Sequence, residues 1–235
     1  MPGRNKKDPT ESHSTLEQMQ NGAVTFVDVL GWKGIWLKKQ ADDVIGKLQQ
    51  LVDLADKTKK EFRGTDMYVE AEVLSISDTI VILSKGAPEK ALQLHAQICA
   101  KLIPDSIRKG IPVRGATAYG KFLTGNGTTL VGPAIDEAAA WHEATDWMGV
   151  IMTPSAEYQY TPSKPWVKYI ETPIKSSGLR EFFVVDWSNQ IGDKEIRKLF
   201  SDAGPLDPAI APKYKNTLRF LDKMKQDQLK ALGGH

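Results

Sequence analysis

The stretch AVTFVDVLGWKGIW, residues 23–36, decides the fold because a strand, an acid and a turn follow one another in it. Its run of β-branched and aromatic residues over 23–29 predicts a buried strand. Asp28 stands at the end of that strand, and Gly31 follows where the chain is expected to turn. A carboxylate in this place either serves a site at the end of the strand or caps the helix that comes next.

The rest of the chain alternates helical and extended patterns. Proline opens two of the helical patterns, at Pro88 and Pro133, and glycine occurs in the turns between extended segments. The predicted elements are a helix over 41–62, a hairpin of strands 67–76 and 78–84 with Ser-Asp at its turn, a helix over 88–103, strands over 111–122 and 124–132, a helix over 133–145, a short strand over 149–153, and a closing hairpin over 169–187 with a Ser-Ser-Gly turn.

This order of elements is typical of an α+β fold. It resembles a ferredoxin-like split βαβ sheet with extra strands, so we expect a mixed or antiparallel sheet with flanking helices on one face. The other face and the loops would then be free for a site. We expect one folded domain over 21–187, a polar and mobile segment over 1–20, and a polar tail over 188–235 with one helical patch over 214–232.

The composition excludes several functional classes. The 235 residues include 31 basic and 29 acidic side chains, and this balance predicts no general affinity for nucleic acid or membranes. No apolar run is long enough to span a bilayer, and the N-terminus has no apolar signal-peptide core, so we expect a cytoplasmic protein. The single cysteine, Cys99, excludes disulfide bonds within the chain.

Two acids are expected to meet at one end of the sheet. Asp78 lies in the turn of the hairpin that should pair with the first strand, where Asp28 ends. Two carboxylates followed by a backbone carbonyl make an oxygen site suited to magnesium or manganese. The turn after Asp28 would add N–H groups for an anion, which is a triphosphate site in outline. The alternative is that Asp28 caps a helix and Asp78 only fills a turn.

Several motifs occur in one order over 23–186. They are FVDVLGW (26–32), SISDTIVILSKG (75–86), VRGATAYGKF (113–122), VGPAIDEAAAWHEA (131–144) and PIKSSGLREFF (173–183). Together they resemble the motifs of class III nucleotidyl cyclases, and the resemblance covers most of the chain. It implies the catalytic-domain fold of that family over 21–187.

The resemblance also implies a chemistry. In that family two aspartates bind two divalent ions, Mn²⁺ or Mg²⁺, which hold a nucleoside triphosphate while its ribose 3′-hydroxyl attacks the α-phosphate. Carried over, Asp28 and Asp78 are the metal ligands, with help from the Val29 carbonyl. The N–H groups of Leu30, Gly31 and Trp32 would hold phosphate.

The positions that read a purine in this family differ here. Adenylate cyclases have a lysine four residues before the second acid, where this chain has Leu74. The partner aspartate of that lysine is replaced by Thr129, and the pair used by guanylate cyclases is absent as well. A polar base edge left unpaired in a closed site costs about 1–3 kcal/mol per group. These positions therefore predict a base other than a purine.

The catalytic positions differ too. Asp136 stands at the family's asparagine and Ala140 at its transition-state arginine, whereas the first lysine of the late hairpin is kept as Lys175. Arg114 is the candidate replacement cation, and its alternative role is an ion pair between strands. His142, two residues past Ala140, either faces the nucleotide of a partner chain or is plain surface.

Short single-domain cyclases with these features resemble the pyrimidine cyclases of bacterial Pycsar anti-phage systems. That resemblance implies a homodimer with shared active sites, UTP or CTP as substrate, and a separate effector protein that responds to the cyclic nucleotide. We expect conversion of UTP to cyclic UMP. The alternatives are a cytidylate cyclase that makes cyclic CMP, and a degenerate cyclase fold that binds a nucleotide without catalysis.

Overall fold

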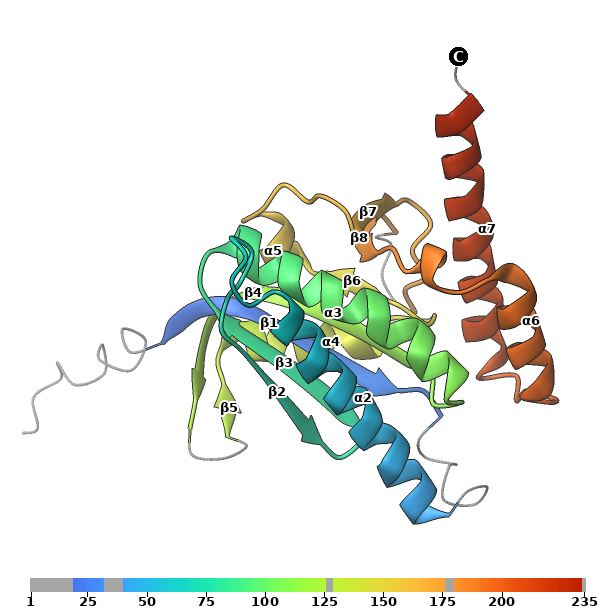
Figure 1. The fold of residues 1–235 in the computed structure, drawn as a ribbon, viewed down its shortest axis with the longest axis horizontal. Coiled ribbons are helices and arrows are strands. Elements are labelled where there is room, and N and C mark those ends of the chain that lie inside the picture. Colours follow the sequence, from blue (N-terminus) through green and yellow to red (C-terminus); the bar gives the residue numbers. More distant parts are fainter. Residues whose placement is uncertain (1–18, 32–39, 126–128, 176–179, 234–235) are drawn as a thin grey trace, which may run out of the picture.

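The computed structural model describes residues 19–31, 40–125, 129–175 and 180–233, and a mixed sheet forms its centre (Figure 1). The strands follow the order β2-β3-β1-β4-β6-β8-β7, with β5 paired to β4. Among the described strands only β4 and β6 run parallel. The strands are β1 (Gln20–Val29), β2 (Ala71–Ile76), β3 (Thr79–Lys85), β4 (Val113–Thr124), β5 (Leu130–Val131), β6 (Val150–Met152), β7 (Trp166–Tyr169) and β8 (Phe182–Val185).

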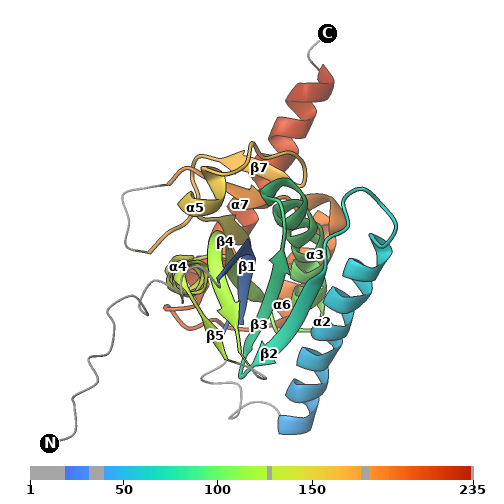
Figure 2. The same cartoon turned by 90° about the vertical axis from the view of Figure 1, so that its left-hand side faces the viewer.

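Helices cover both faces of this sheet, as the side view in Figure 2 shows. The helices are α2 (Ala41–Glu61), α3 (Pro88–Arg108), α4 (Pro133–Ala144), α5 (Pro154–Glu157), the 3-10 helix η3 (Ser188–Gln190), α6 (Asp193–Asp202) and α7 (Ala211–Gly233). Ala23 and Val27 of β1 are buried in the cluster that contains α2 and α3, whereas Val24 is buried in a second cluster with Ala134 and Ala138 of α4. The prediction of helices on one face only is therefore wrong. Strand β1 is apolar on both sides, so both sides need a cover.

The hairpin that carries Asp78 is confirmed. Strands β2 and β3 pair antiparallel with Ile76 opposite Thr79, which leaves Ser77 and Asp78 as a two-residue turn. Ser77 has a φ of 57°, the left-handed value that tight hairpin turns require. The helices over 41–62 and 88–103 are confirmed as well, although α3 continues through Pro104 to Arg108 because Ile107 extends its buried face.

The closing hairpin differs from its prediction. The sequence predicted that the first strand of this hairpin begins at Tyr169. In the structure the first strand is β7, which ends at Tyr169, opposite Phe182 of β8. Trp166 and Tyr169 are buried in the main core, and their burial sets this register. The predicted Ser-Ser-Gly turn lies outside the described residues.

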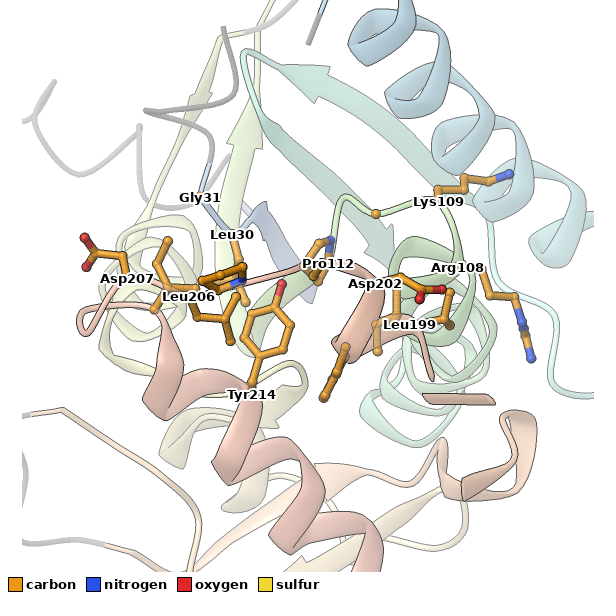
Figure 3. A pocket seen from close by; sticks show the side chains of 16 residues that line it. Leu30, Gly31, Arg108, Lys109, Pro112, Leu199, Asp202, Leu206, Asp207 and Tyr214 are labelled. Atoms are coloured by element: carbon orange, nitrogen blue, oxygen red, sulfur yellow. The ribbon is translucent and has the colours of Figure 1, made fainter. Parts of the chain in front are cut away.

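The C-terminal segment packs against the domain through two helices, of which the sequence predicted only the second. Ile196 of α6 and Phe220 of α7 are fully buried in the main core cluster. Figure 3 shows Leu199 and Tyr214 of these helices beside Leu30 and Pro112, and together they line a cleft. The end of α7 extends beyond the sheet (Figures 1 and 2).

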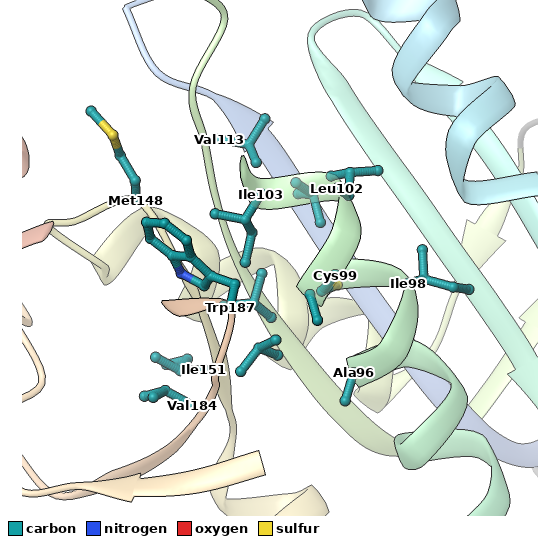
Figure 4. Packing of buried hydrophobic residues seen from close by; sticks show 14 of the residues in the cluster. Ala96, Ile98, Cys99, Leu102, Ile103, Val113, Met148, Ile151, Val184 and Trp187 are labelled. Atoms are coloured by element: carbon teal, nitrogen blue, oxygen red, sulfur yellow. The ribbon is translucent and has the colours of Figure 1, made fainter. Parts of the chain in front are cut away.

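The main core lies between α3 and the centre of the sheet. Figure 4 shows Ile98, Leu102 and Ile103 of α3 on one side, with Ile151 and Val184 of the sheet on the other. Cys99 is buried in the same cluster, and burial raises the pKa of its thiol to about 12. No helix in the described ranges has the length and apolar character needed to cross a bilayer.

A polar network is enclosed within this core. His95 of α3 contacts Thr25 of β1 through Nδ1 at 2.7 Å and Ser84 of β3 through Nε2 at 2.9 Å. The Thr25 hydroxyl also lies 2.7 Å from that of Thr117 on β4. Burial lowers the pKa of His95 to about 3, so the imidazole is neutral in the folded protein.

This burial predicts a loss of stability in acid that depends on His95. The folded pKa is about 3 and the ordinary value is 6.5, so the contribution of the neutral imidazole is complete above pH 6.5 and is lost as the pH falls toward 3. The slope is at most about 1.4 kcal/mol per pH unit. We expect urea denaturation at pH 7, 6 and 5 to show a steeper decline for the wild type than for His95→Gln. Equal slopes would contradict the assignment, because the carboxylates contribute to both proteins alike.

Candidate active site

The two acids come together at one end of the sheet. Asp28 lies opposite Thr79 of β3 on one side and opposite Arg114 of β4 on the other. The Val29 N–H donates a hydrogen bond of 3.2 Å to the Asp78 carbonyl, so the hairpin turn is tied to the end of β1. In an extended strand the N–H and C=O of one residue point to the same side, so the Val29 carbonyl also faces Asp78.

The electrostatics of this pair favour a bound cation. Burial raises the pKa of Asp28 and the Asp78 charge raises it further, while Arg114 and His142 act in the opposite direction. Two nearby carboxylates repel each other when both are ionised, and a cation between them removes this repulsion. The described residues contain no group of three or more His, Cys, Asp or Glu side chains placed to hold a metal. The acid pair with the Val29 carbonyl therefore fits divalent ions whose other ligands are phosphate oxygens and water.

The turn after β1 is only partly available for phosphate. The Leu30 N–H donates to the Pro112 carbonyl at 2.8 Å, so it is engaged within the protein and would have to leave this partner to bind phosphate. Strand β1 ends at Val29 as predicted, and the Leu30 N–H adds one hydrogen bond to the residue that precedes β4. Gly31 is exposed with a φ of +81°, and Trp32 lies outside the described residues.

Arg114 is held against Asp28 and the end of α4. Its Nε and Nη2 each lie 3.4 Å from one Asp28 oxygen, and Nη1 donates to the carbonyls of Glu143 and Thr145 at 2.9 Å. The neighbouring Gly115 allows β4 to approach β1 closely, because a Cβ there would lie 2.4 Å from the Phe26 carbonyl oxygen. The structure thus places Arg114 in the ion pair between strands that was the alternative to a catalytic role.

Lys175 reaches the same helix end. Its Nζ donates to the Glu143 carbonyl at 2.8 Å, which brings a second cation beside Arg114. Burial lowers the pKa of Lys175, and the charges of Arg114 and Lys213 lower it further. Cations are favoured at a helix C-terminus, where carbonyl groups have no partner in the helix. Both predicted catalytic residues therefore lie together, on the side of β4 that faces α4.

His142 lies near Asp28 of its own chain. Its side chain is buried, its ring centroid lies 5.8 Å from that of Phe26, and its charge acts on Asp28. The buried Nδ1 has no hydrogen-bond partner among the described residues. Residue 142 follows the buried Ile135 by two helical turns, and this spacing was the available signal for an inward side chain.

The predicted base-reading and helix residues lie apart from the acids. Leu74 is half-buried and packs against the α4 cluster, whereas Thr129 is exposed and accepts the Gly125 N–H at 2.8 Å through its carbonyl. Asp136 and Ala140 are exposed on one face of α4. In the described part of the chain, no hydrogen bond or ion pair joins Thr129 or Asp136 to the two acids.

No family model matches this sequence, and no curated protein does. Solved structures do match the fold. The adenylyl cyclase CyaB from P. aeruginosa has a TM-score of 0.52 at 14% identity, over 74% of this chain and 98% of that one. The guanylate cyclase domain of RhGC from Catenaria anguillulae, solved with GTP, has a TM-score of 0.52 at 16% identity, over 71% and 96%.

A third match is the monomeric guanylyl cyclase domain of the RhoGC fusion protein from Blastocladiella emersonii, with a TM-score of 0.52 at 17% identity, over 71% and 95%. The three matches share one architecture across nearly the whole length of the other chains. The chain therefore has the α+β fold of a class III nucleotidyl cyclase catalytic domain, as its sequence predicted.

Proposed function

We propose that this protein is a nucleotidyl cyclase that converts UTP to 3′,5′-cyclic UMP and diphosphate. The observation that carries the proposal is the Asp28–Asp78 pair, which the Val29 hydrogen bond fixes at the end of β1. The fold of a cyclase catalytic domain supports it, because the pair lies on the first strand and the first hairpin of that fold.

Each residue of the site has a distinct task in this proposal. Asp28 and Asp78 would hold two divalent ions, Mn²⁺ or Mg²⁺, which supply Lewis acidity toward the ribose 3′-hydroxyl and the phosphate oxygens. The Val29 carbonyl adds a ligand. Arg114 orients the Asp28 carboxylate and limits the rise in its pKa. Lys175, whose Nζ lies at the end of α4, adds positive charge for the triphosphate.

The base preference rests on the character of two side chains. Leu74 has no polar atom to pair with a purine, and the exposed Thr129 offers only a short hydroxyl. A purine in the family's pose would leave its polar edge unpaired, at about 1–3 kcal/mol for each group. A smaller pyrimidine ring avoids that arrangement, and UTP is our choice over CTP.

Competition among the triphosphates tests this preference. We expect cyclic UMP to dominate when ATP, GTP, CTP and UTP are supplied at equal concentration with Mn²⁺ and the products are identified by mass spectrometry. The double variant Leu74→Lys, Thr129→Asp should shift product toward cyclic AMP, because it restores a hydrogen-bonding pair. Dominant cyclic CMP from the wild type would overturn only the choice of UTP. Dominant cyclic AMP or cyclic GMP would overturn the pyrimidine preference.

The site is proposed to be completed by a second copy of the chain. Asp136 and Ala140 share an exposed face of α4 and do not contact the acids of their own chain, which suits a role in a partner's site. Mixing Asp28→Asn with Ala140→Trp should restore up to about a quarter of wild-type activity, because half of the dimers would hold one intact site of two. A fully active monomer would contradict the shared site.

A nucleotide-binding protein without catalysis is the second candidate. It is favoured by Ala140 at the transition-state position and by the engagement of Arg114 with Asp28 and α4. Losing one charge contact in the transition state costs about 10²–10³-fold. Triphosphate binding with no cyclic product in the competition experiment would establish this candidate.

The biological role follows from the product. We propose that the cyclic nucleotide is a second messenger in the bacterial cytoplasm, where it activates a separate effector protein during phage infection. The resemblance to Pycsar cyclases supports this role. Nucleotide extraction from infected cells that carry the wild type or Asp28→Asn should show cyclic UMP only with the wild type.

A further inference from the structure

A cleft of about 650 Å³ lies between the domain and its C-terminal helices (Figure 3). Its walls come from the end of β1, the end of α3 with the start of β4, and the segment that joins α6 to α7. Pockets for small molecules in proteins enclose about 300–1,000 Å³ and occur where separate packing units meet. The cleft therefore has the size and the position of a ligand site, apart from the acid pair.

The lining of this cleft suits a flat aromatic molecule. Phe200 and Tyr214 meet edge to face with their ring centroids 4.5 Å apart, and Leu199, Leu206 and Ile210 add apolar surface. Figure 3 shows the Tyr214 ring with its hydroxyl directed toward Leu30 and Pro112. Burial raises the pKa of Tyr214, and its hydroxyl donates to no described residue. One polar group in an apolar wall fixes the orientation of a ligand.

Three of the four charged residues of the lining are ion-paired within the protein, and the fourth, Asp207, accepts only a backbone N–H. Arg108 binds the Glu195 carboxylate and the Gln190 carbonyl. Lys109 binds the Asp105 carboxylate and the Gln50 side-chain oxygen. Asp202 binds Lys198, and Asp207 accepts the Ala209 N–H. An anionic ligand would lie beside the Asp207 carboxylate and would have to displace a carboxylate from Arg108 or Lys109, so the lining disfavours a negatively charged ligand.

The cleft is connected to the end of β1. Leu30 and Pro112 both line it, and they are joined by the 2.8 Å hydrogen bond from the Leu30 N–H to the Pro112 carbonyl. Leu30 is two residues from Asp28. A molecule that packs against both residues would stabilise the backbone that positions the acid pair.

We propose that this cleft binds a neutral, planar aromatic small molecule that accepts a hydrogen bond from Tyr214. We further infer that its binding orders the end of β1 and thereby raises activity, and this second step rests on the cyclase function proposed above. The ligand class is set by the two aromatic side chains, the Tyr214 hydroxyl, which has no hydrogen-bond partner among the described residues, and the charges of the lining, which disfavour an anion.

Binding is tested on the full chain by titration calorimetry with 2-naphthol and its anionic counterpart 2-naphthoate. We expect saturable binding of 2-naphthol that is at least tenfold tighter than that of 2-naphthoate. Tyr214→Phe should weaken 2-naphthol binding about 5- to 10-fold through the lost hydrogen bond, and Ala203→Trp should abolish it by filling the cleft. Tyr158→Phe is the matched control, because Tyr158 is 82% exposed and lies outside the cleft.

The outcomes separate the parts of the proposal. Absence of saturable binding, equal affinity for both probes, or unchanged binding to Ala203→Trp would overturn the site. Hydrogen exchange of the Leu30 amide, followed by mass spectrometry, should slow when 2-naphthol is bound, and unchanged exchange would overturn the connection to β1. This measurement needs no turnover. If exchange slows but the wild type cyclises no triphosphate, the site stands and the cyclase function fails.

Discussion

Replacing Asp28 by asparagine is expected to reduce cyclase activity at least about 10³-fold while the fold is kept. The loss follows from removing a metal ligand, because metal ions supply several kcal/mol of transition-state stabilisation and each 1.36 kcal/mol is tenfold in rate. Asparagine has nearly the same shape, so the pairing of β1 with β3 and β4 does not depend on the lost charge. Product formation from UTP with Mn²⁺ measures the effect.

The same substitution should stabilise the protein at neutral pH. The folded protein raises the pKa of Asp28 above 3.8, mainly through burial and then through the Asp78 charge, so the folded state disfavours the ionised form. For a raised carboxyl pKa this penalty is absent below the unfolded value and complete above the folded one. Asp28→Asn removes it at pH 7, and thermal unfolding should show a higher Tm than that of the wild type.

Manganese gives a second measurement that does not depend on turnover. Ligands that bind only the folded state raise Tm, so Mn²⁺ should raise the Tm of the wild type and leave that of Asp28→Asn almost unchanged. Asp66→Asn is the matched control, because Asp66 is exposed in the connection between α2 and β2 and not at the β2–β3 turn, and it should respond as the wild type does. Near-wild-type activity of Asp28→Asn would contradict the metal assignment. Asp78→Asn should behave in the same way, since the Asp78 carbonyl that binds the Val29 N–H remains.

Phe220→Ala is expected to destabilise the protein by about 3–5 kcal/mol, the usual cost of truncating a buried phenylalanine. The ring is fully buried, with centroids 4.7 Å from Trp147, 5.4 Å from Tyr169 and 5.9 Å from Trp187. These rings come from distant parts of the chain and cannot collapse into the space that alanine leaves. Chemical denaturation measures the change.

Leu229→Ala provides the comparison on the same helix. Leu229 is 61% exposed, so its truncation should change the free energy of unfolding by no more than about 0.5 kcal/mol. If Phe220→Ala were as mild, α7 would be a peripheral addition and not a part of the core. A large loss would instead mean that the chain needs its last helix to fold.

Elements with a strong local pattern could be predicted from the sequence. Strand β1, the hairpin around Ser77 and the helix with Val44 and Leu51 on its inner face all follow from periodicity and turn chemistry. Helix α6 was missed although Ile196, Leu199 and Phe200 have the i, i+3, i+4 spacing of an amphipathic helix, because the helix is short and only Ile196 is fully buried. The prediction of the closing hairpin was wrong because the burial of Trp166 in the main core sets its register. A local sequence pattern does not show which residues are buried by distant parts of the chain.

The site residues also differ in how far their positions could be predicted from local patterns. The meeting of Asp28 and Asp78 could be predicted, because one hairpin and one strand pairing bring them together. The position of His142 beside Asp28 required α4 to lie against β1, and the expected one-sided arrangement of helices excluded that contact. The occupied Leu30 N–H depends on the Pro112 carbonyl, which is distant in the sequence.

The two-residue turn at Ser77 and Asp78 also limits how the chain can vary in length. An inserted residue there would shift the register of β3 or lengthen the loop, and either change would carry Asp78 away from the end of β1. An insertion beside the exposed Thr161, between α5 and β7, would meet no such restriction. In natural variants of this chain, insertions and deletions should therefore accumulate between α5 and β7 and be excluded from the β2–β3 turn.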